Sequence, residues 1–173
     1  PVYPTQRPVY PTQRPVYPTQ RPVYPVQNPV QQSWITYNFD NTFQLTMPDE
    51  WKQIRPLPPP PPSNVDMFSK DGYMFRIFIH PPDKSGDLQI SMMALIDIMK
   101  NKANLQLIDG PSGDNNSGNF IMKNNITGTM VFNILCFNSM KTKIYVLSVA
   151  SPYQDYSGKT ELNNIIKTFK WIE

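Results

Sequence analysis

Alternation of apolar and polar residues marks the first two elements of the folded part of the chain. Residues 35–39 and 43–47 alternate on either side of Asp40 and Asn41, a pair that favours a tight turn. Because successive strand residues point to opposite faces, this pattern predicts an antiparallel hairpin with one face in water. The apolar set, Ile35 included, is expected to face the core.

The next elements are strands and a helix. Trp51 lies in a short segment that we expect to fold back over the sheet, residues 65–68 predict a short strand, and residues 73–79 alternate as a longer one. The period then changes to intervals of four, three and four residues, which predicts an amphipathic helix over 87–102 with Asp87 as its N-cap. The apolar stripe is Leu88, Met92, Leu95 and Met99. We expect the methionines of this helix, Met92, Met93 and Met99, to fill the core rather than to line a groove that binds varied partners.

The most apolar strands lie in the C-terminal half. Residues 105–108 predict a further strand, and residues 109–119 have the Asp, Asn, Gly and Ser composition that is typical of turns and loops. Residues 130–137 and 143–150 are apolar at both alternating sets of positions. They therefore predict strands that are covered on both faces, at the centre of the sheet.

A closing helix completes the order of elements. Its apolar residues predict that it begins near Ser157, whose hydroxyl can cap it, and ends near Lys170. Short turns between strands favour antiparallel pairing, and central strands covered twice require helices on both sides of the sheet. The pattern predicts an α+β fold, an α/β/α sandwich with a central antiparallel sheet, as one domain over residues 33–173.

Residues 1–32 form a separate, repetitive tail. PVYPTQR occurs three times and is followed by the decayed copy PVYPVQN. Pro at the first and fourth positions of each unit fixes φ and removes backbone donors, so we expect an extended polyproline II segment that reaches about 100 Å at ~3.1 Å per residue. Two interpretations stand: a passive tether, or a docking element that contacts a partner through Tyr3, Tyr10, Tyr17 and Tyr24.

The net charge of the chain belongs to this tail. Arg7, Arg14 and Arg21 account for the formal charge of +3, because the other 13 basic residues balance the 13 acidic ones. A folded part without net charge lacks the basic surface that nucleic-acid binding requires. We therefore expect protein partners and no nucleic acid.

Residues for catalysis or metal binding are few. The single Cys, Cys136, lies in the most apolar strand, where cysteine behaves as a small hydrophobe, and the single His, His80, ends another strand. A cysteine nucleophile needs a base within about 3 Å, and one His cannot build a multi-His metal site. Gly158 to Thr160 resembles the end of a phosphate loop but lacks its earlier glycine. We expect no enzyme activity, no cofactor and no metal.

The sharpest local motif is the proline run at residues 55–62. Arg55, Pro58 and Pro61 have the spacing that places a basic residue and two prolines on one edge of a polyproline II helix, as an SH3-type groove requires. A rigid loop inserted between two strands explains the same prolines. Recognition by an aromatic groove and stiffening of a loop therefore both stand as interpretations.

Two segments of the chain resemble the Mog1/PsbP-like fold. Asp40 to Lys52, DNTFQLTMPDEWK, is similar to the opening of that family, in which an alternating strand runs into Pro and then Trp, and the C-terminal NNIIKTFKWIE is similar to its closing helix and short strand. The resemblance implies a non-enzymatic module that binds proteins, as relatives do in photosystems, GTPase regulation, bacterial envelopes and the chaperoning of secretion effectors. The stretch after the Trp is short in that family and here holds RPLPPPPPS, so a family contact surface at that place is not carried over.

These features lead to two functional hypotheses. The first is a binding or scaffold module of a bacterial cell-envelope assembly on the periplasmic side, held on the Pro-rich tether and reaching the membrane only through a lipid anchor upstream of Pro1. The second is a cytosolic adaptor or chaperone for apolar partner segments, recruited through its polyproline segments. The free Cys136 suits the reducing compartment of the second hypothesis. The oligomeric state is left open by the sequence.

Overall fold

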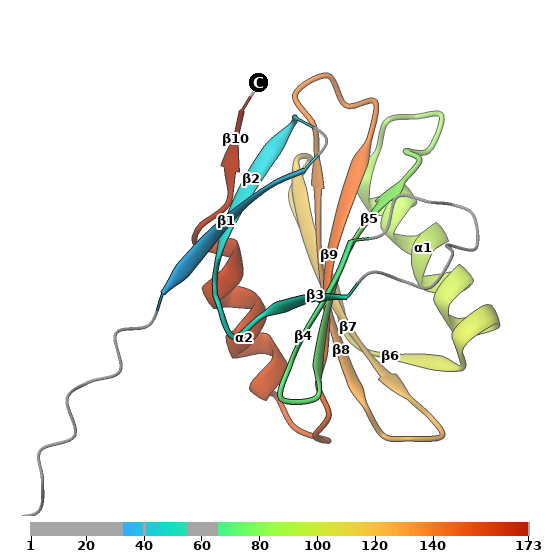
Figure 1. Ribbon diagram of the computed structural model, residues 1–173. Coiled ribbons are helices and arrows are strands. Elements are labelled where there is room, and N and C mark those ends of the chain that lie inside the picture. The colour runs from blue at the N-terminus through green and yellow to red at the C-terminus, as the bar shows by residue number, and fades with distance from the viewer. Residues whose placement is uncertain (1–32, 40, 55–65, 173) are drawn as a thin grey trace, which may run out of the picture. The chain divides into compact units, whose positions relative to one another are not determined.

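The computed structural model describes residues 33–39, 41–54 and 66–172 (Figure 1). The described residues form two helices, α1 (Leu88–Ala103) and α2 (Ser157–Ile166). The strands are β1 (Trp34–Phe39), β2 (Phe43–Pro48), β3 (Lys52–Ile54), β4 (Asp66–Lys70), β5 (Tyr73–His80), β6 (Leu105–Gly113), β7 (Ser117–Asn124), β8 (Met130–Phe137), β9 (Ile144–Ala150) and β10 (Lys170–Trp171).

A large antiparallel sheet forms the middle layer, with its strands in the order β3-β4-β5-β9-β8-β7-β6. Helix α1 packs on one face of this sheet, against β6 and β7, and α2 packs on the other face, against β8 and β9. A second sheet, β1-β2-β10, lies on the α2 side (Figure 1). The predicted α/β/α sandwich is confirmed, and the small sheet is an addition to it.

Strand β9 lies at the centre of the large sheet and contributes to two separate cores. Tyr145, Leu147 and Val149 belong to the core on the α2 side, together with the apolar residues of β2. Ile144 and Val146 belong to the core under α1. The apolar runs at 130–137 and 143–150 therefore form adjacent central strands, as predicted, because most of both faces of each strand is covered.

The predicted N-terminal hairpin is present, but one of its apolar residues is less buried than expected. Strands β1 and β2 pair along their length, and the Thr42 N–H donates to the Phe39 carbonyl at 2.9 Å to close the turn, where Asn41 has a φ of 53°. Ile35 lies on the core side of the hairpin, opposite the buried Met47, but 41% of its surface is exposed. The reason is that β1 is the outer strand of the small sheet, with no neighbour on its other edge among the described strands.

Trp51 is buried, as expected for a residue that folds back over the sheet. Its ring meets that of Phe75 at 6.1 Å between centroids in an edge-to-face arrangement. The residues that follow it differ from the prediction, because Lys52–Ile54 join the large sheet as its edge strand β3 and pair with β4. The short strand predicted at residues 65–68 is described from Asp66 onward, as β4.

Helix α1 begins where the sequence predicts. The Asp87 carboxylate accepts hydrogen bonds from the backbone N–H groups of Gln89, at 2.7 Å, and Ile90, at 3.3 Å, as an N-cap does. Met92 is fully buried under the helix. The expectation that Met93 fills the core is wrong, because this position points away from the sheet and 44% of its surface is exposed.

The segment 109–119, expected to be loop throughout, is mostly strand. Strand β6 continues to Gly113 and β7 begins at Ser117, so the turn is confined to the residues around Asp114. The Asp114 carboxylate accepts from the N–H groups of Asn116 and Ser117 and closes that turn. Gly and Pro are tolerated here because β6 is the edge of the sheet and its pairing with β7 shifts register twice.

Helix α2 is shorter than predicted and is capped differently. It ends at Ile166, because β10 pairs with β2 and draws the last residues into the small sheet. The Ser157 hydroxyl does not cap the helix; it donates instead to the Asp155 carboxylate at 2.5 Å. The closing helix followed by a short strand, implied by the family resemblance, is present.

Candidate functional site

The predicted partner-binding residues lie outside the described part of the chain. These are Arg55, Pro58 and Pro61 of the proline run and Tyr3, Tyr10, Tyr17 and Tyr24 of the repeats. Their roles stay predictions, as does the extent of the tail.

The large sheet separates His80 from Cys136. His80 lies opposite Ile144, a residue of the core under α1, whereas Cys136 packs against the core on the α2 side. Burial raises the pKa of the Cys136 thiol to about 12 and lowers the pKa of His80, so both groups are neutral at pH 7. This pair therefore cannot act as a nucleophile and its base.

Gly158 serves the packing of α2. A Cβ atom at this position would lie 2.9 Å from the Cδ2 and Cε2 atoms of Phe132, so only glycine lets the first turn of α2 approach β8 this closely. The segment is a helix start, as predicted. Close packing of α2 on β8 explains the glycine without a role in phosphate binding. Within residues 33–39, 41–54 and 66–172, no group of three His, Cys, Asp or Glu side chains could hold a metal ion.

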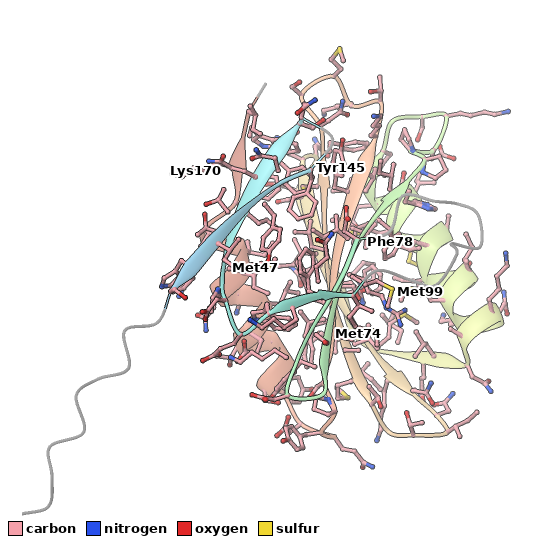
Figure 2. All side chains as sticks on the ribbon, in the orientation of Figure 1. Met47, Met74, Phe78, Met99, Tyr145 and Lys170 are labelled. Atoms are coloured by element: carbon pink, nitrogen blue, oxygen red, sulfur yellow. The ribbon has the colours of Figure 1, made fainter. Side chains whose placement is uncertain are left out.

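A groove of about 370 Å³ lies on the large sheet beside α1. Its apolar lining includes Met74 and Phe78 of β5, Met99 of α1 and Val131 of β8. In Figure 2 the labelled side chains of Met74, Phe78 and Met99 lie between β5 and α1. The sequence predicted Met99 as core, and it is half-buried at the edge of that core.

The groove exists because α1 covers only part of its face of the sheet. The helix packs on β6 and β7 at one side, and the sheet continues through β9 to β5 and its edge. Along β5, Phe75 and Ile77 point into the core on the α2 side, and the alternate residues Met74, Arg76 and Phe78 point toward the groove.

A row of polar residues crosses the floor of this face. Arg76 lies opposite Ser148 in the β5–β9 pair, and Ser148 lies opposite Asn133 in the β8–β9 pair. The Asn133 amide donates to the carbonyls of Val131, at 3.3 Å, and Phe120, at 3.5 Å, and among the described residues its Oδ1 has no hydrogen-bond partner. Such a buried, unsatisfied acceptor costs stability.

Arg76 is the charged residue of the groove. Its Nε and Nη2 atoms lie 3.1 and 2.9 Å from the Met74 Sδ atom. No carboxylate of the described residues lies within ion-pair distance of it. The guanidinium is exposed, always charged and open to an anionic group of a partner.

Two other pockets of the described residues are less suited to binding a partner, one because its cation is already paired and one because it is smaller. One, of about 390 Å³, lies between Trp34 and α2 and contains Lys70, whose Nζ is already bound by Glu50 at 2.9 Å and Glu161 at 3.5 Å. Burial lowers the pKa of Lys70, but these carboxylates outweigh it and the pKa is raised overall, so the cation is satisfied within the fold. The other, between α2 and the β7–β8 pair, is smaller, at about 200 Å³.

Sequence reasoning missed the groove and the row of three polar residues that leads into it. Ser148 and Asn133 stand inside apolar strands, where a single polar residue gives no signal, and Arg76 stands at a position that alternation assigns to solvent. The site exists because α1 covers only part of the sheet, and this depends on the tertiary structure.

Neither described helix is long and apolar enough to cross a membrane.

The elements and their arrangement define a small α+β sandwich built on an antiparallel sheet. The particular fold is the Mog1/PsbP-like fold. The structure of the Saccharomyces cerevisiae Ran-binding protein Mog1p matches with a TM-score of 0.58 and 9% sequence identity, over 82% of this chain and 97% of that one. A point mutant of Mog1 matches with a TM-score of 0.56 and 8% identity, over the same shares of the two chains. No family model and no curated protein sequence matches.

Proposed function

We propose that this chain is a non-catalytic protein-binding module that holds its partner in the groove between α1 and β5. One observation carries the proposal. The apolar side chains of Met74, Phe78 and Met99 lie beside the guanidinium of Arg76, which has no carboxylate partner among the described residues, on a sheet face that α1 leaves open. An exposed apolar surface beside a polar anchor is typical of interaction sites. Methionine is well suited to such a surface because its flexible thioether adapts to different shapes.

The fold supports a protein as the class of ligand. Mog1p, which shares this fold, is a Ran-binding protein, so its own ligand is a protein. We carry over the class of ligand and not Ran itself, because folds host many different functions and the two sequences are 9% identical.

Two methionines of α1 offer a matched test of the groove. Met99 lines it, whereas Met93 is exposed elsewhere on the helix. Met→Gln keeps the shape of the side chain and makes its end polar, so Met99→Gln removes apolar contact without a charge change. The tagged chain and each variant are used to isolate partners from the source cells, and captured proteins are quantified by mass spectrometry.

The proposal expects at least one protein that the wild type and Met93→Gln capture equally and that Met99→Gln captures at least about fivefold less, since about 1 kcal/mol corresponds to that factor. Circular dichroism and thermal unfolding check that the Met99→Gln variant is folded. Equal capture by all three chains, or no protein above the background of an untagged control, contradicts the proposal.

A second part of the proposal concerns the tail, residues 1–32, and where it places the module in the cell. We propose that residues 1–32 hold it at a distance from an attachment point in the bacterial cell envelope; the spacing of Pro in the repeats, which favours an extended chain, supports this. Removal of residues 1–32 is then expected to leave folding intact and to abolish correct placement.

The cytosolic adaptor stands as the alternative location for the same binding activity. Mass spectrometry of the native N-terminus after cell fractionation separates the two. A lipidated or signal-cleaved terminus supports the envelope, and an unprocessed terminus in the cytosolic fraction supports the adaptor.

A further inference from the structure

On the sheet face that continues from the groove over β5, β4 and β3, the described residues include cations but no carboxylates. The register places Ile54 of β3 and Met67 of β4 in line with Arg76, and Lys52 and Ser69 in line with Met74, all on the side that faces α1. Two cations, Lys52 and Arg76, thus stand among apolar residues. No carboxylate of the described residues of these strands faces this side, because Asp66 lies in line with Ile77 and points to the other face.

Among the described residues, carboxylates neutralise a cation on the opposite face of the sheet but not on this face. Lys70, which points to the α2 side, is held between Glu50 and Glu161. Arg76 has only the thioether of Met74 beside it among the described residues. A guanidinium left without a carboxylate in an apolar surrounding is complementary to an acidic group of a partner.

The dimensions suit a polypeptide better than a single anionic head group. At a strand spacing of ~4.8 Å, the face from β3 to β8 is roughly 20 Å wide, and the backbones of Lys52 and Arg76 lie roughly 12 Å apart. Two acidic side chains four residues apart in an extended chain span a similar distance, at ~3.3 Å per residue. The floor also includes Ser148, whose surface is almost fully buried where it lines the groove.

We propose that the groove binds an extended segment of a partner protein in which acidic residues flank a large apolar side chain. The apolar side chain lies against Met74, Phe78 and Met99, and one carboxylate pairs with Arg76. The inference rests on the proposed function and adds the chemistry of the partner to it.

Charge disfavours the two Pro-rich segments of this chain as occupants. Residues 1–32 carry Arg7, Arg14 and Arg21, residues 55–65 carry Arg55, and neither segment contains an acidic residue. Both would bring a cation to a surface that already holds Lys52 and Arg76.

A selection from a random peptide display library tests the partner chemistry without knowledge of the partner. The full chain, its Arg76→Glu variant and its Lys141→Glu variant serve as baits. Lys141 lies in the turn after β8, at the opposite end of that strand from Val131, so Lys141→Glu makes the same change in net charge away from the groove. Selected peptides are then titrated into isotope-labelled protein, and the shifted backbone amides are mapped by NMR.

The wild type and Lys141→Glu are expected to enrich Asp or Glu next to Leu, Ile, Phe or Met, with amide shifts in β5, β9 and the end of α1. Arg76→Glu is expected to bind the same peptides at least about tenfold more weakly and to enrich Lys or Arg instead. No enrichment by the wild type, the same composition for all three baits, or shifts confined to the small sheet overturn the inference.

Two other occupants would show in the same experiment and would also overturn it. Amides of the groove that shift with protein concentration alone indicate a second copy of the chain. Peptide binding that occurs only after residues 55–62 are replaced by a Gly/Ser linker indicates the chain's own proline run. If Met99→Gln still lowers partner capture in either case, the proposed function survives and only the partner chemistry fails.

Discussion

Ser148 and Asn133 lie directly opposite each other in the β8–β9 pair, and both are buried, with 5% and 2% of their surfaces exposed. They interrupt the apolar face of the two most buried strands, and Arg76 continues the row into the groove. Polar residues that break the pattern of a core cost stability and are expected where a protein has a function to serve. The row therefore connects the interior of the sheet with the surface that we propose to bind a partner.

Asn133→Leu is expected to raise the free energy of unfolding by about 1 kcal/mol. The substitution removes the Oδ1 acceptor that has no partner among the described residues, and the two hydrogen bonds that it also removes are long, at 3.3 and 3.5 Å. Asn138 is a matched control, because it is equally buried but accepts from the N–H groups of Thr142 at 2.8 Å and Lys143 at 2.9 Å. Asn138→Leu is expected to lower the free energy of unfolding by about 2 kcal/mol. Urea denaturation of the three chains measures both effects, and a loss of stability in Asn133→Leu equal to that in Asn138→Leu would show that Oδ1 is satisfied.

Cys136 is expected to react slowly with thiol reagents in the folded protein. Burial raises its pKa from 9.0 to about 12, so the thiolate fraction at pH 8 is on the order of 1,000-fold lower than in the unfolded chain. Alkylation by iodoacetamide, followed by mass spectrometry with and without 8 M urea, measures the ratio of rates. Equal rates in the two conditions would contradict the burial of this thiol and reopen the question of its chemistry.

Protonation of His80 is expected to destabilise the fold. Burial lowers the pKa of this imidazole below its ordinary value of 6.5 in the folded chain, so the unfolded chain binds its proton first as the pH falls. Above pH 6.5 the imidazole is neutral in both states and does not lower the free energy of unfolding. The free energy of unfolding falls as the pH drops through the interval between the unfolded and the folded pKa. Urea denaturation at pH 7 and pH 5 is expected to show a smaller loss of stability for His80→Gln than for the wild type, and an NMR titration gives the folded pKa directly. A folded pKa at or above the ordinary value would disprove the prediction.

Gly158→Ala is expected to lower the free energy of unfolding by about 1–3 kcal/mol, because its Cβ would meet the Phe132 ring at 2.9 Å. Thr160→Ala, at an exposed position of the same helix, is the control and is expected to change stability by about 0.5 kcal/mol or less. Thermal unfolding of both variants provides the comparison. Unchanged stability in Gly158→Ala would mean that α2 can move away from β8 at little cost.

Most of the fold could be predicted from periodicity, and the errors share a cause. The alternating runs, the helical stripe and the Asp87 cap are local signals, and the structure confirms them. The turn composition of residues 109–119 concealed a strand because an edge strand tolerates Gly and Pro. The end of α2 was misplaced because Lys170 and Trp171 leave the helix to pair with β2, a contact with no local signal.

The groove could not be predicted, because it depends on where α1 lies across the sheet. Periodicity places Met99 on the buried side of a helix, and Arg76 on the polar side of a strand, but does not tell which strands the helix covers. Only the observed packing of α1 on β6 and β7 leaves Met99, Phe78 and Arg76 around one open surface. The motifs that stood out in the sequence, the repeats and the proline run, lie outside the described residues.

Photo-cross-linking in the source cells tests the binding groove most directly. A p-benzoylphenylalanine residue replaces Met74, in the groove, or Met140, which is exposed in the turn between β8 and β9 and serves as the control. Position 74 is expected to cross-link to a distinct partner protein, and position 140 is not. Cross-links to that protein from position 140 alone, or equally from both positions, would contradict binding in the groove.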